Sequence, residues 1–263
     1  MAEPAVPNLD VAAAKAYEEL FVPAMFAAWA ERVADAAQLR PGFSVLDVAC
    51  GTGVLARAAA ARVAPGGRVT GVDPSDGMRA VAAQRAPGLA WEKGVAESLP
   101  FPAGSFDAVL SQFGLMFFAD RARGLSEMWR VLRPGGRLVV AVWGALEATP
   151  AYVAFIALLA RLFGAEQANT LRAPFALGDP AALLALVREA GIPSAQLATP
   201  PGHTRFPSLR SWVEADARGW LQLDDAQFEK LWAAAQRDLA SYVAADGSVA
   251  FAMPAHVVSA VKG

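Results

Sequence analysis

The stretch VLDVACGTG, residues 45–53, decides the fold because it joins an apolar run to a glycine-rich turn. A continuous apolar run is typical of a strand covered on both faces. A glycine-rich turn that then opens a helix, expected here over residues 54–63, lets the backbone approach a ligand and offers it unpaired N–H groups. Asp47 interrupts the apolar run with a carboxylate, which is costly to bury unless it is paired. Asp47 therefore indicates a partner or a ligand that meets its charge.

The rest of the first half repeats the same alternation of helix and strand. Four Pro-Gly pairs follow helix-like stretches there: Pro41-Gly42, Pro65-Gly66, Pro87-Gly88 and Pro134-Gly135. Proline cannot continue a helix, and glycine readily takes the left-handed conformation at a helix end, so each pair predicts a helix-to-strand connection. The predicted strands are residues 43–48, 68–72, 89–92, 106–110 and 137–142.

Strands that alternate with helices predict a doubly wound, mostly parallel α/β sheet over residues 41–145. Residues 1–40 are expected to form an N-terminal helical cap, with helices at 11–20 and 23–38. Residues 146–247 are expected to form a helical lid or substrate region, inserted late in the chain, with one sheet strand at 195–199. Its predicted helices are 149–163, 180–190, 208–220 and 224–244. Residues 248–263 are expected to be terminal strands that complete the sheet.

The overall composition excludes several classes of protein. The 263 residues carry a net charge of −2 and only four lysines, so a basic surface for nucleic acid is missing. One cysteine excludes an internal disulfide and suits a reducing compartment. The N-terminus does not resemble a signal peptide, and the longest apolar run, residues 151–160, is too short to span a bilayer. We therefore expect a cytoplasmic protein with no integral membrane segment and no nucleic-acid partner; the oligomeric state stays open.

The glycine turn by itself is compatible with more than one nucleoside ligand. Gly51-Thr-Gly53-Val-Leu-Ala56 satisfies a loose dinucleotide pattern, and Asp73 ends the next strand where a carboxylate commonly accepts ribose hydroxyls. Asp47, however, would repel a pyrophosphate and favour a ligand with an ammonium or sulfonium cation. No tyrosine has a lysine four residues later, as a common redox site would require. An NAD(P)-dependent oxidoreductase and a catalytically silent nucleoside-binding protein remain the alternatives.

Four ordered motifs resemble the class I S-adenosylmethionine-dependent methyltransferases, in the branch of the ubiquinone/menaquinone-biosynthesis enzymes. They are VLDVACGTG, GVDPSDGM, GVAESLPFPAGSFDAVLSQFGLMFF and RVLRPGGRL, all between residues 45 and 142. The resemblance implies a Rossmann-like fold, S-adenosyl-L-methionine as the cofactor, and methyl transfer to a small molecule by in-line displacement. The C-terminal half is only loosely similar to these enzymes.

The resemblance also implies a set of cofactor contacts. The glycines of the turn approach the methionine part, Asp47 holds its amino-acid end directly or through water, and Asp73 accepts both ribose hydroxyls. The complete set is Tyr17, Asp47, Ala49, Gly51, Gly53, Asp73, Pro74, Met78, Ala96, Glu97 and Ser111. Structural roles compete for some of them, since Asp47 can cap loop amides, Met78 can pack a helix and Tyr17 can be one more buried aromatic residue.

One position departs from the family pattern. Relatives usually have an aspartate, which receives the adenine amino group, where this chain has Val95. The backbone around Ala96 can still contact the ring edge. How the amino group is bound stays open, because Glu97 either takes over the contact or is simply solvated.

The sequence shows no obvious catalytic base, and methyl transfer needs one only if the acceptor must lose a proton. Candidates are Gln112, which can orient an acceptor or bond to loop backbone, Tyr17, and His203, for which a surface position is the competing interpretation. His256 is expected to be structural, and neither histidine has metal-ligand spacing. Six large apolar residues predict an apolar or aromatic acceptor, whose identity and methylated atom stay open: Phe155, Phe163, Phe175, Trp212, Trp220 and Trp232.

Overall fold

The centre of the protein is a seven-stranded sheet in the order β3-β2-β1-β4-β5-β9-β6. A computed structural model describes residues 10–263. The strands are β1 (Ser44–Val48), β2 (Arg68–Asp73), β3 (Ala90–Lys93), β4 (Phe106–Gln112), β5 (Leu132–Trp143), β6 (Gln196–Ala198) and β9 (Ala255–Val261). Strands β1 to β5 are parallel, and β9 runs antiparallel between β5 and β6. The predicted doubly wound, mostly parallel sheet is confirmed.

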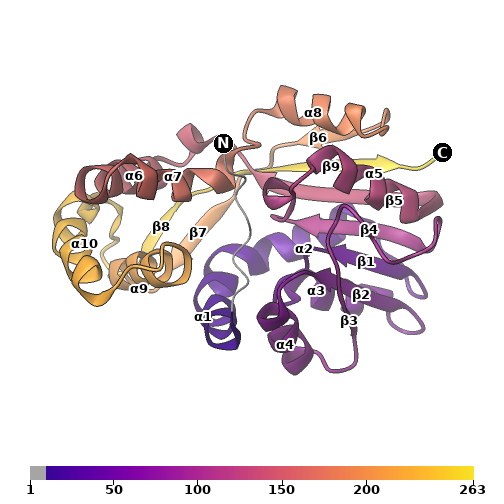
Figure 1. Ribbon diagram of the computed structural model, residues 1–263, viewed down its shortest axis with the longest axis horizontal. Coiled ribbons are helices and arrows are strands. Elements are labelled where there is room, and N and C mark those ends of the chain that lie inside the picture. The colour runs from indigo at the N-terminus through magenta and orange to yellow at the C-terminus, as the bar shows by residue number, and fades with distance from the viewer. Residues whose placement is uncertain (1–9) are drawn as a thin grey trace.

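Helices cover both faces of this sheet. They are α2 (Ala27–Ala36), α3 (Val54–Val63), α4 (Asp76–Arg85), α5 (Arg121–Val131) and α8 (Pro180–Glu189). Because the strand order reverses between β1 and β4, right-handed crossovers place α3 and α4 on one face and α5 on the other. Helix α2 packs on α3, and α8 packs on α5 (Figure 1). Ligands in such sheets bind at the carboxyl ends of the strands, where the order reverses.

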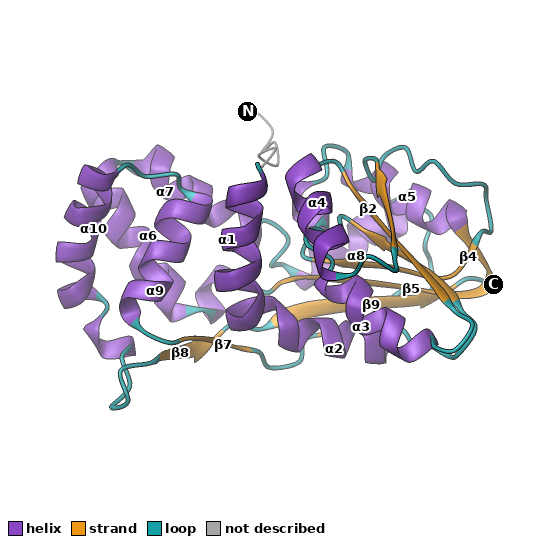
Figure 2. Ribbon diagram, turned by 90° about the horizontal axis from the view of Figure 1, so that it is seen from below, coloured by secondary structure: helices purple, strands orange, loops and turns teal. Residues whose placement is uncertain are grey.

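A second group of helices with two short strands, which we call the helical region, lies beside the sheet. It consists of α6 (Pro150–Phe163), α7 (Ala165–Arg172), α9 (Leu209–Glu214) with the turn Ala215–Trp220 that follows it, α10 (Asp225–Asp238) and the paired strands β7 (His203–Phe206) and β8 (Val249–Ala252). Figures 1 and 2 show α1 (Val11–Phe21) between this region and the sheet. Trp212 is fully buried against Phe155 and Phe251, so the region has its own aromatic core.

Two expectations about the second half need correction. Residues 146–247 contain the expected sheet strand, β6, but not all of their helices belong to a lid, because α8 packs on α5 beside the sheet. The terminal strands do not both complete the sheet, because β8 pairs with β7 in a separate two-stranded sheet. Alternate residues of β8 are buried and exposed, as in a strand with one covered face, whereas β9 is buried along most of its length.

Three predicted helices differ from the observed ones in detail. The helix expected at 224–244 begins with a capping box between Asp224 and Gln227 but ends at Asp238. The helices expected at 23–38 and 208–220 each contain a π-helical turn, Val22–Phe26 and Ala215–Trp220. Such turns are rare and frequently occur at functional sites. Both border the cavities described below.

A helix that crosses a lipid bilayer must be both long and apolar. Between residues 10 and 263, no single helix has the length and apolar character needed to cross one. One pair of helices that is bent at a short break, Ala165–Phe175 with Pro180–Glu189, is long and apolar enough when taken together, by length and composition only.

Candidate functional site

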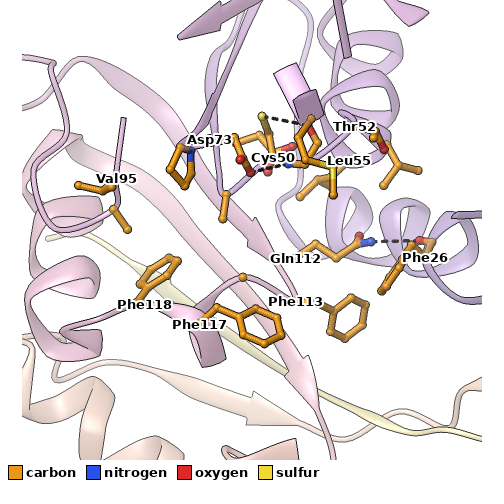
Figure 3. Close-up of a pocket in the computed structure, with 18 of the residues that line it drawn as sticks. Phe26, Cys50, Thr52, Leu55, Asp73, Val95, Gln112, Phe113, Phe117 and Phe118 are labelled. Carbon is orange, nitrogen blue, oxygen red and sulfur yellow. Dashed lines mark hydrogen bonds between the residues drawn. The ribbon is translucent and has the colours of Figure 1, made fainter. Parts of the chain in front are cut away.

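A cavity of about 350 Å³ lies at the carboxyl ends of β1 and β4, where the strand order reverses (Figure 3). The turn after β1, the end of β2 and the segment after β3 form much of its wall. Tyr17 and Phe26 line it from the N-terminal helices and Trp220 from the helical region. Ten of the residues predicted from the sequence line this cavity: Tyr17, Asp47, Ala49, Gly51, Asp73, Pro74, Met78, Ala96, Glu97 and Gln112.

Three other predicted residues do not line the cavity. His203 lies on β7 with an exposed side chain, which agrees with its surface interpretation. Ser111 is fully buried in β4, and its hydroxyl has no hydrogen-bond partner. Gly53 caps α3 in the left-handed conformation, with φ 81°. Its role in the structure is to leave space for the indole of Trp91, which a Cβ at this position would overlap.

Replacement of Gly53 by alanine is expected to lower the free energy of unfolding by about 2–4 kcal/mol, the sum of overpacking and left-handed strain. Gly66 is the matched control, because it has φ 85° and a Cβ added there would meet no atom within 4 Å. Gly66→Ala should therefore lower the free energy of unfolding only by the left-handed strain, about 1 kcal/mol. Urea unfolding of both variants measures the difference, and equal losses would contradict the role given to Trp91.

Asp47 is the most unusual group in the cavity wall. Its side chain is 1% exposed, and neither carboxylate oxygen makes a regular hydrogen bond. Burial raises the pKa of Asp47 to about 8, the Ala56 amide opposes this, and the charge of Asp73 adds to it. The amides of the glycine turn have other acceptors, since Gly51 N–H donates to Asp73 and Gly53 N–H to the Cys50 carbonyl. These two amides therefore do not depend on Asp47, and a cation bound in the cavity would favour the ionised form of its carboxyl group.

Asp73 connects the two strand ends that form the cavity floor. Its Oδ2 accepts the Gly51 amide at 2.9 Å, and its Oδ1 accepts the Ser75 amide at 2.8 Å. Burial raises the pKa of Asp73, while these two amides and Arg79 lower it. Each carboxylate oxygen has further lone pairs, so Asp73 can also accept hydrogen bonds from a ligand.

The backbone is strained on both sides of the cavity. Ala49, after β1, has φ 57°, and Phe113, after β4, has φ 55°, both in the left-handed region that favours glycine. Such strain costs on the order of 1 kcal/mol or more at each residue and occurs mainly at functional sites. The two turns meet closely, because a Cβ on Gly114 would lie 2.6 Å from the Cβ of Ala49.

The segment after β3 forms the wall where the resemblance expects the adenine edge. Val95 lines the cavity with 46% of its surface exposed, and Ala96 is buried. Glu97 Oε1 accepts the Asp120 amide at 3.2 Å, at the start of α5. Glu97 is therefore neither simply solvated nor entirely free for a ligand.

Gln112 and Tyr17 connect the sheet to the N-terminal helices. Gln112 Nε2 donates to the Phe26 carbonyl at 3.1 Å, and its buried Oε1 has no partner (Figure 3). Tyr17 stacks on Phe26 with 5.3 Å between ring centroids. Burial, together with the carboxylates of Asp73 and Glu18, raises the pKa of Tyr17, so its phenol stays neutral at ordinary pH.

A second cavity, of about 80 Å³, adjoins the first on the side of the helical region. Five aromatic residues line both cavities: Tyr17, Phe26, Phe113, Phe117 and Trp220. Trp143, which stacks on Phe113 at 3.6 Å, lines the second together with Tyr152 and Asp216. Our sequence reasoning missed Asp216, although it follows the apolar Trp212 by four residues and thus lies on the same buried helix face.

The six large apolar residues expected in the lid have different positions. Phe175 and Trp220 line the cavities. Phe155 and Trp212 are fully buried in the core of the helical region, while Phe163 and Trp232 are half-buried and line neither cavity. His256 is buried and bonds to Thr199 and the Gly178 carbonyl, which agrees with a structural role. Within residues 10–263, no group of three or more histidine, cysteine or acidic side chains is arranged to hold a metal.

Comparison with known protein families identifies the central part of the chain. Residues 46–140 match the family described as a methyltransferase domain. This part of the chain is similar to a methyltransferase domain. The domain contains the glycine turn, Asp47 and Asp73, and it ends within β5. The predicted resemblance to methyltransferases is confirmed for these residues.

Several known proteins are similar to the chain in sequence or in fold. The demethylmenaquinone methyltransferase of Beutenbergia cavernae is 46% identical over 130 residues, which are 49% of this chain and 51% of that protein. The match thus spans about half the length of this relative. The phosphoethanolamine N-methyltransferase 2 of Haemonchus contortus, solved with S-adenosylhomocysteine, has a TM-score of 0.62 at 21% identity, covering 95% of this chain and 56% of that one. The [4+2]-cyclase SpnF has a TM-score of 0.55 at 20% identity, covering 90% and 81%, so the fold alone does not determine the reaction.

Proposed function

We propose that the chain binds S-adenosyl-L-methionine in the main cavity and transfers its methyl group to a small apolar or aromatic molecule. The observation that carries this proposal is the buried Asp47 carboxylate, which lines the cavity without a regular hydrogen bond. A buried carboxyl group is costly to ionise unless a ligand brings an opposite charge next to it. S-adenosyl-L-methionine brings an ammonium group and a sulfonium group, so it compensates this charge where a pyrophosphate would oppose it.

Different residues of the domain would bind different parts of the cofactor. Asp73 would accept the ribose hydroxyls, since its carboxylate lines the cavity and is fixed by two backbone amides. Met78 and Ala96 would contact the adenine, and the Gly51 turn would lie against the methionine part. Val95 offers no side-chain acceptor for the adenine amino group, so that contact would fall to backbone or Glu97. When bound, the cofactor supplies a methyl group on a sulfonium sulfur, which is a good leaving group.

The aromatic wall between the two cavities is the place for the acceptor. It would hold the acceptor next to the cofactor cavity and exclude water, which is most of what an in-line displacement requires. Residues 10–40 and the helical region would act as its cap and lid, because Tyr17, Phe26 and Trp220 come from them. The name of the Beutenbergia relative refers to a quinone-type substrate, which supports an aromatic acceptor here as well.

The two alternatives receive less support. A dinucleotide-dependent oxidoreductase would place a pyrophosphate near the Asp47 carboxylate, and the family match is to methyltransferases. A catalytically silent nucleoside-binding protein would not need an aromatic acceptor wall beside its nucleoside cavity.

Calorimetry with the purified protein tests the cofactor. S-adenosylmethionine and S-adenosylhomocysteine are expected to bind, with S-adenosylmethionine the more dependent on Asp47 because only it carries the sulfonium charge. NAD is expected not to bind at comparable concentrations. Binding of NAD in place of the other two would overturn the proposal.

Transfer of a labelled methyl group tests the reaction. A panel of phenols, hydroquinones and aliphatic amines is incubated with protein and labelled S-adenosylmethionine, and S-adenosylhomocysteine is quantified. Aromatic acceptors are expected to be the better substrates. Faster transfer to the aliphatic amines would contradict the acceptor class, and cofactor binding without transfer to any acceptor would favour the silent protein.

A further inference from the structure

Asp216 is a second buried carboxylate that the proposed cofactor site does not use. It lies in the π-helical turn Ala215–Trp220, is 2% exposed and lines the smaller cavity. The Tyr152 hydroxyl is 3.1 Å from Oδ2 and 3.3 Å from Oδ1, so a neutral donor holds the carboxylate in place. Within the described residues 10–263, no lysine, arginine or histidine forms an ion pair with Asp216.

The surroundings of Asp216 are almost entirely apolar. The smaller cavity is otherwise lined by aromatic and aliphatic side chains, such as Phe175, Leu171 and Met253. Burial raises the pKa of Asp216 to about 7, and the Tyr152 hydroxyl and the Trp212 side chain oppose this rise. A carboxyl group whose pKa lies near the working pH is in the best range for accepting a proton.

The position of Asp216 connects it to the acceptor wall. Trp220 follows it by four residues in the same π-helical turn and lines both cavities. An aromatic ring held against the shared wall of Phe113, Phe117 and Trp220 would therefore have the cofactor cavity on one side and Asp216 on the other.

We propose that Asp216 binds a phenolic hydroxyl of the acceptor and takes up its proton. The phenolic O–H bond breaks, the proton passes to the Asp216 carboxylate, and the electron pair stays on the phenolate oxygen. Removal of this proton makes the acceptor a stronger nucleophile for the methyl group. The inference rests on the proposed function, because it places the acceptor beside the cofactor cavity.

The cavity favours a hydroxyl over an amine as the group that Asp216 recognises. A neutral phenol enters an apolar cavity without losing the solvation of a charge, whereas an ammonium must first be desolvated. The fold itself already places one phenolic hydroxyl, that of Tyr152, against this carboxylate.

A nitrophenol tests the proposal, because its phenolate absorbs at longer wavelength than the neutral phenol. It is titrated at neutral pH into the wild type and into Asp216→Asn, with and without S-adenosylhomocysteine. Asparagine keeps the volume and an acceptor for the Tyr152 hydroxyl but cannot take up a proton. The variant is expected to bind the probe about tenfold or more weakly and to hold it mainly as the neutral phenol.

Glu229→Gln is the matched control, because it makes the same chemical change on α10, where the carboxylate is 65% exposed. It should bind and ionise the probe as the wild type does. If Asp216→Asn also matched the wild type in affinity and spectrum, or if the wild type held only neutral phenol, the proposal would be wrong. Tighter binding of benzylamine than of nitrophenol, lost in Asp216→Asn, would show a cation site instead.

The same titrations separate this inference from the proposed function. S-adenosylhomocysteine should bind the wild type and Asp216→Asn equally well. If it binds and the nitrophenol result is negative, the inference fails and the proposed cofactor stands. If it does not bind the wild type, the proposed function fails, while the nitrophenol spectra without it still decide whether Asp216 accepts a phenolic proton.

Discussion

Asp73→Ala is expected to weaken the binding of S-adenosylhomocysteine at least about 100-fold. Hydrogen bonds to a charged acceptor contribute about 1.5–3 kcal/mol each, and the carboxylate is expected to accept two from the ribose. The substitution also removes the acceptor of the Gly51 and Ser75 amides, which loosens the turn that forms the cavity floor. Asp73→Asn keeps one oxygen and should lose less affinity.

Asp76→Ala is the control for Asp73. This aspartate is three residues away and pairs with Arg79 and Lys93 at the surface, and it does not line the cavity. Calorimetric affinities of the three variants and the wild type give the comparison. If Asp73→Ala bound S-adenosylhomocysteine within threefold of the wild-type affinity, Asp73 would not be a ligand-binding residue.

The substitution Asp47→Asn is expected to stabilise the ligand-free protein at alkaline pH. The folded protein holds the carboxyl proton up to the raised pKa of about 8, whereas the unfolded chain releases it near 3.8. Between these two pH values folding takes up a proton, so the free energy of unfolding of the wild type falls as pH rises. The loss caused by Asp47 is complete only above about pH 8. The upper bound on this loss of unfolding free energy is on the order of 5 kcal/mol.

Thermal unfolding at pH 4.5 and pH 8.5 measures this effect. Asp47→Asn should unfold several degrees above the wild type at pH 8.5 and close to it at pH 4.5. Some pH dependence should remain in the variant, because burial raises the pKa of Asp73 and of Asp216 as well. The exposed substitution Glu229→Gln is the control for the loss of a carboxylate at the surface.

The same variant separates stability from function. Asp47→Asn should bind S-adenosylmethionine about tenfold more weakly, because the cation loses its charge partner. Gains in stability at the expense of binding are common where a buried charge serves a ligand. Lower stability at pH 8.5 would show that the Asp47 carboxylate has a structural partner, and unchanged affinity would show that the cation lies elsewhere.

Local sequence signals were sufficient for the α/β half. The Pro-Gly connections and the apolar runs placed β1 to β4 to within two residues, because parallel strands buried on both faces must be apolar throughout. The start of β5 was predicted five residues late, since Leu132 already pairs with Phe106 before a register shift. Asp47 could be singled out from the sequence because a carboxylate inside an apolar run is costly to bury.

The second half depended on contacts between distant segments. Strand β8 is an ordinary apolar run in sequence, and only its pairing with β7 assigns it to a separate sheet. His203 was ambiguous for the same reason, since the exposed face of β7 is defined by what packs on the other side.

By itself, the sequence determined the sheet, the glycine turn and the carboxylates at the two strand ends, because each depends on a few adjacent residues. The tertiary structure alone decided the acceptor wall and the Tyr152–Asp216 pair, whose members are 64 residues apart. Whether a carboxylate is solvated or sealed in an apolar cavity depends on the side chains that surround it in space. Periodicity could place Asp216 on a helix face, but only packing could surround it with aromatic rings.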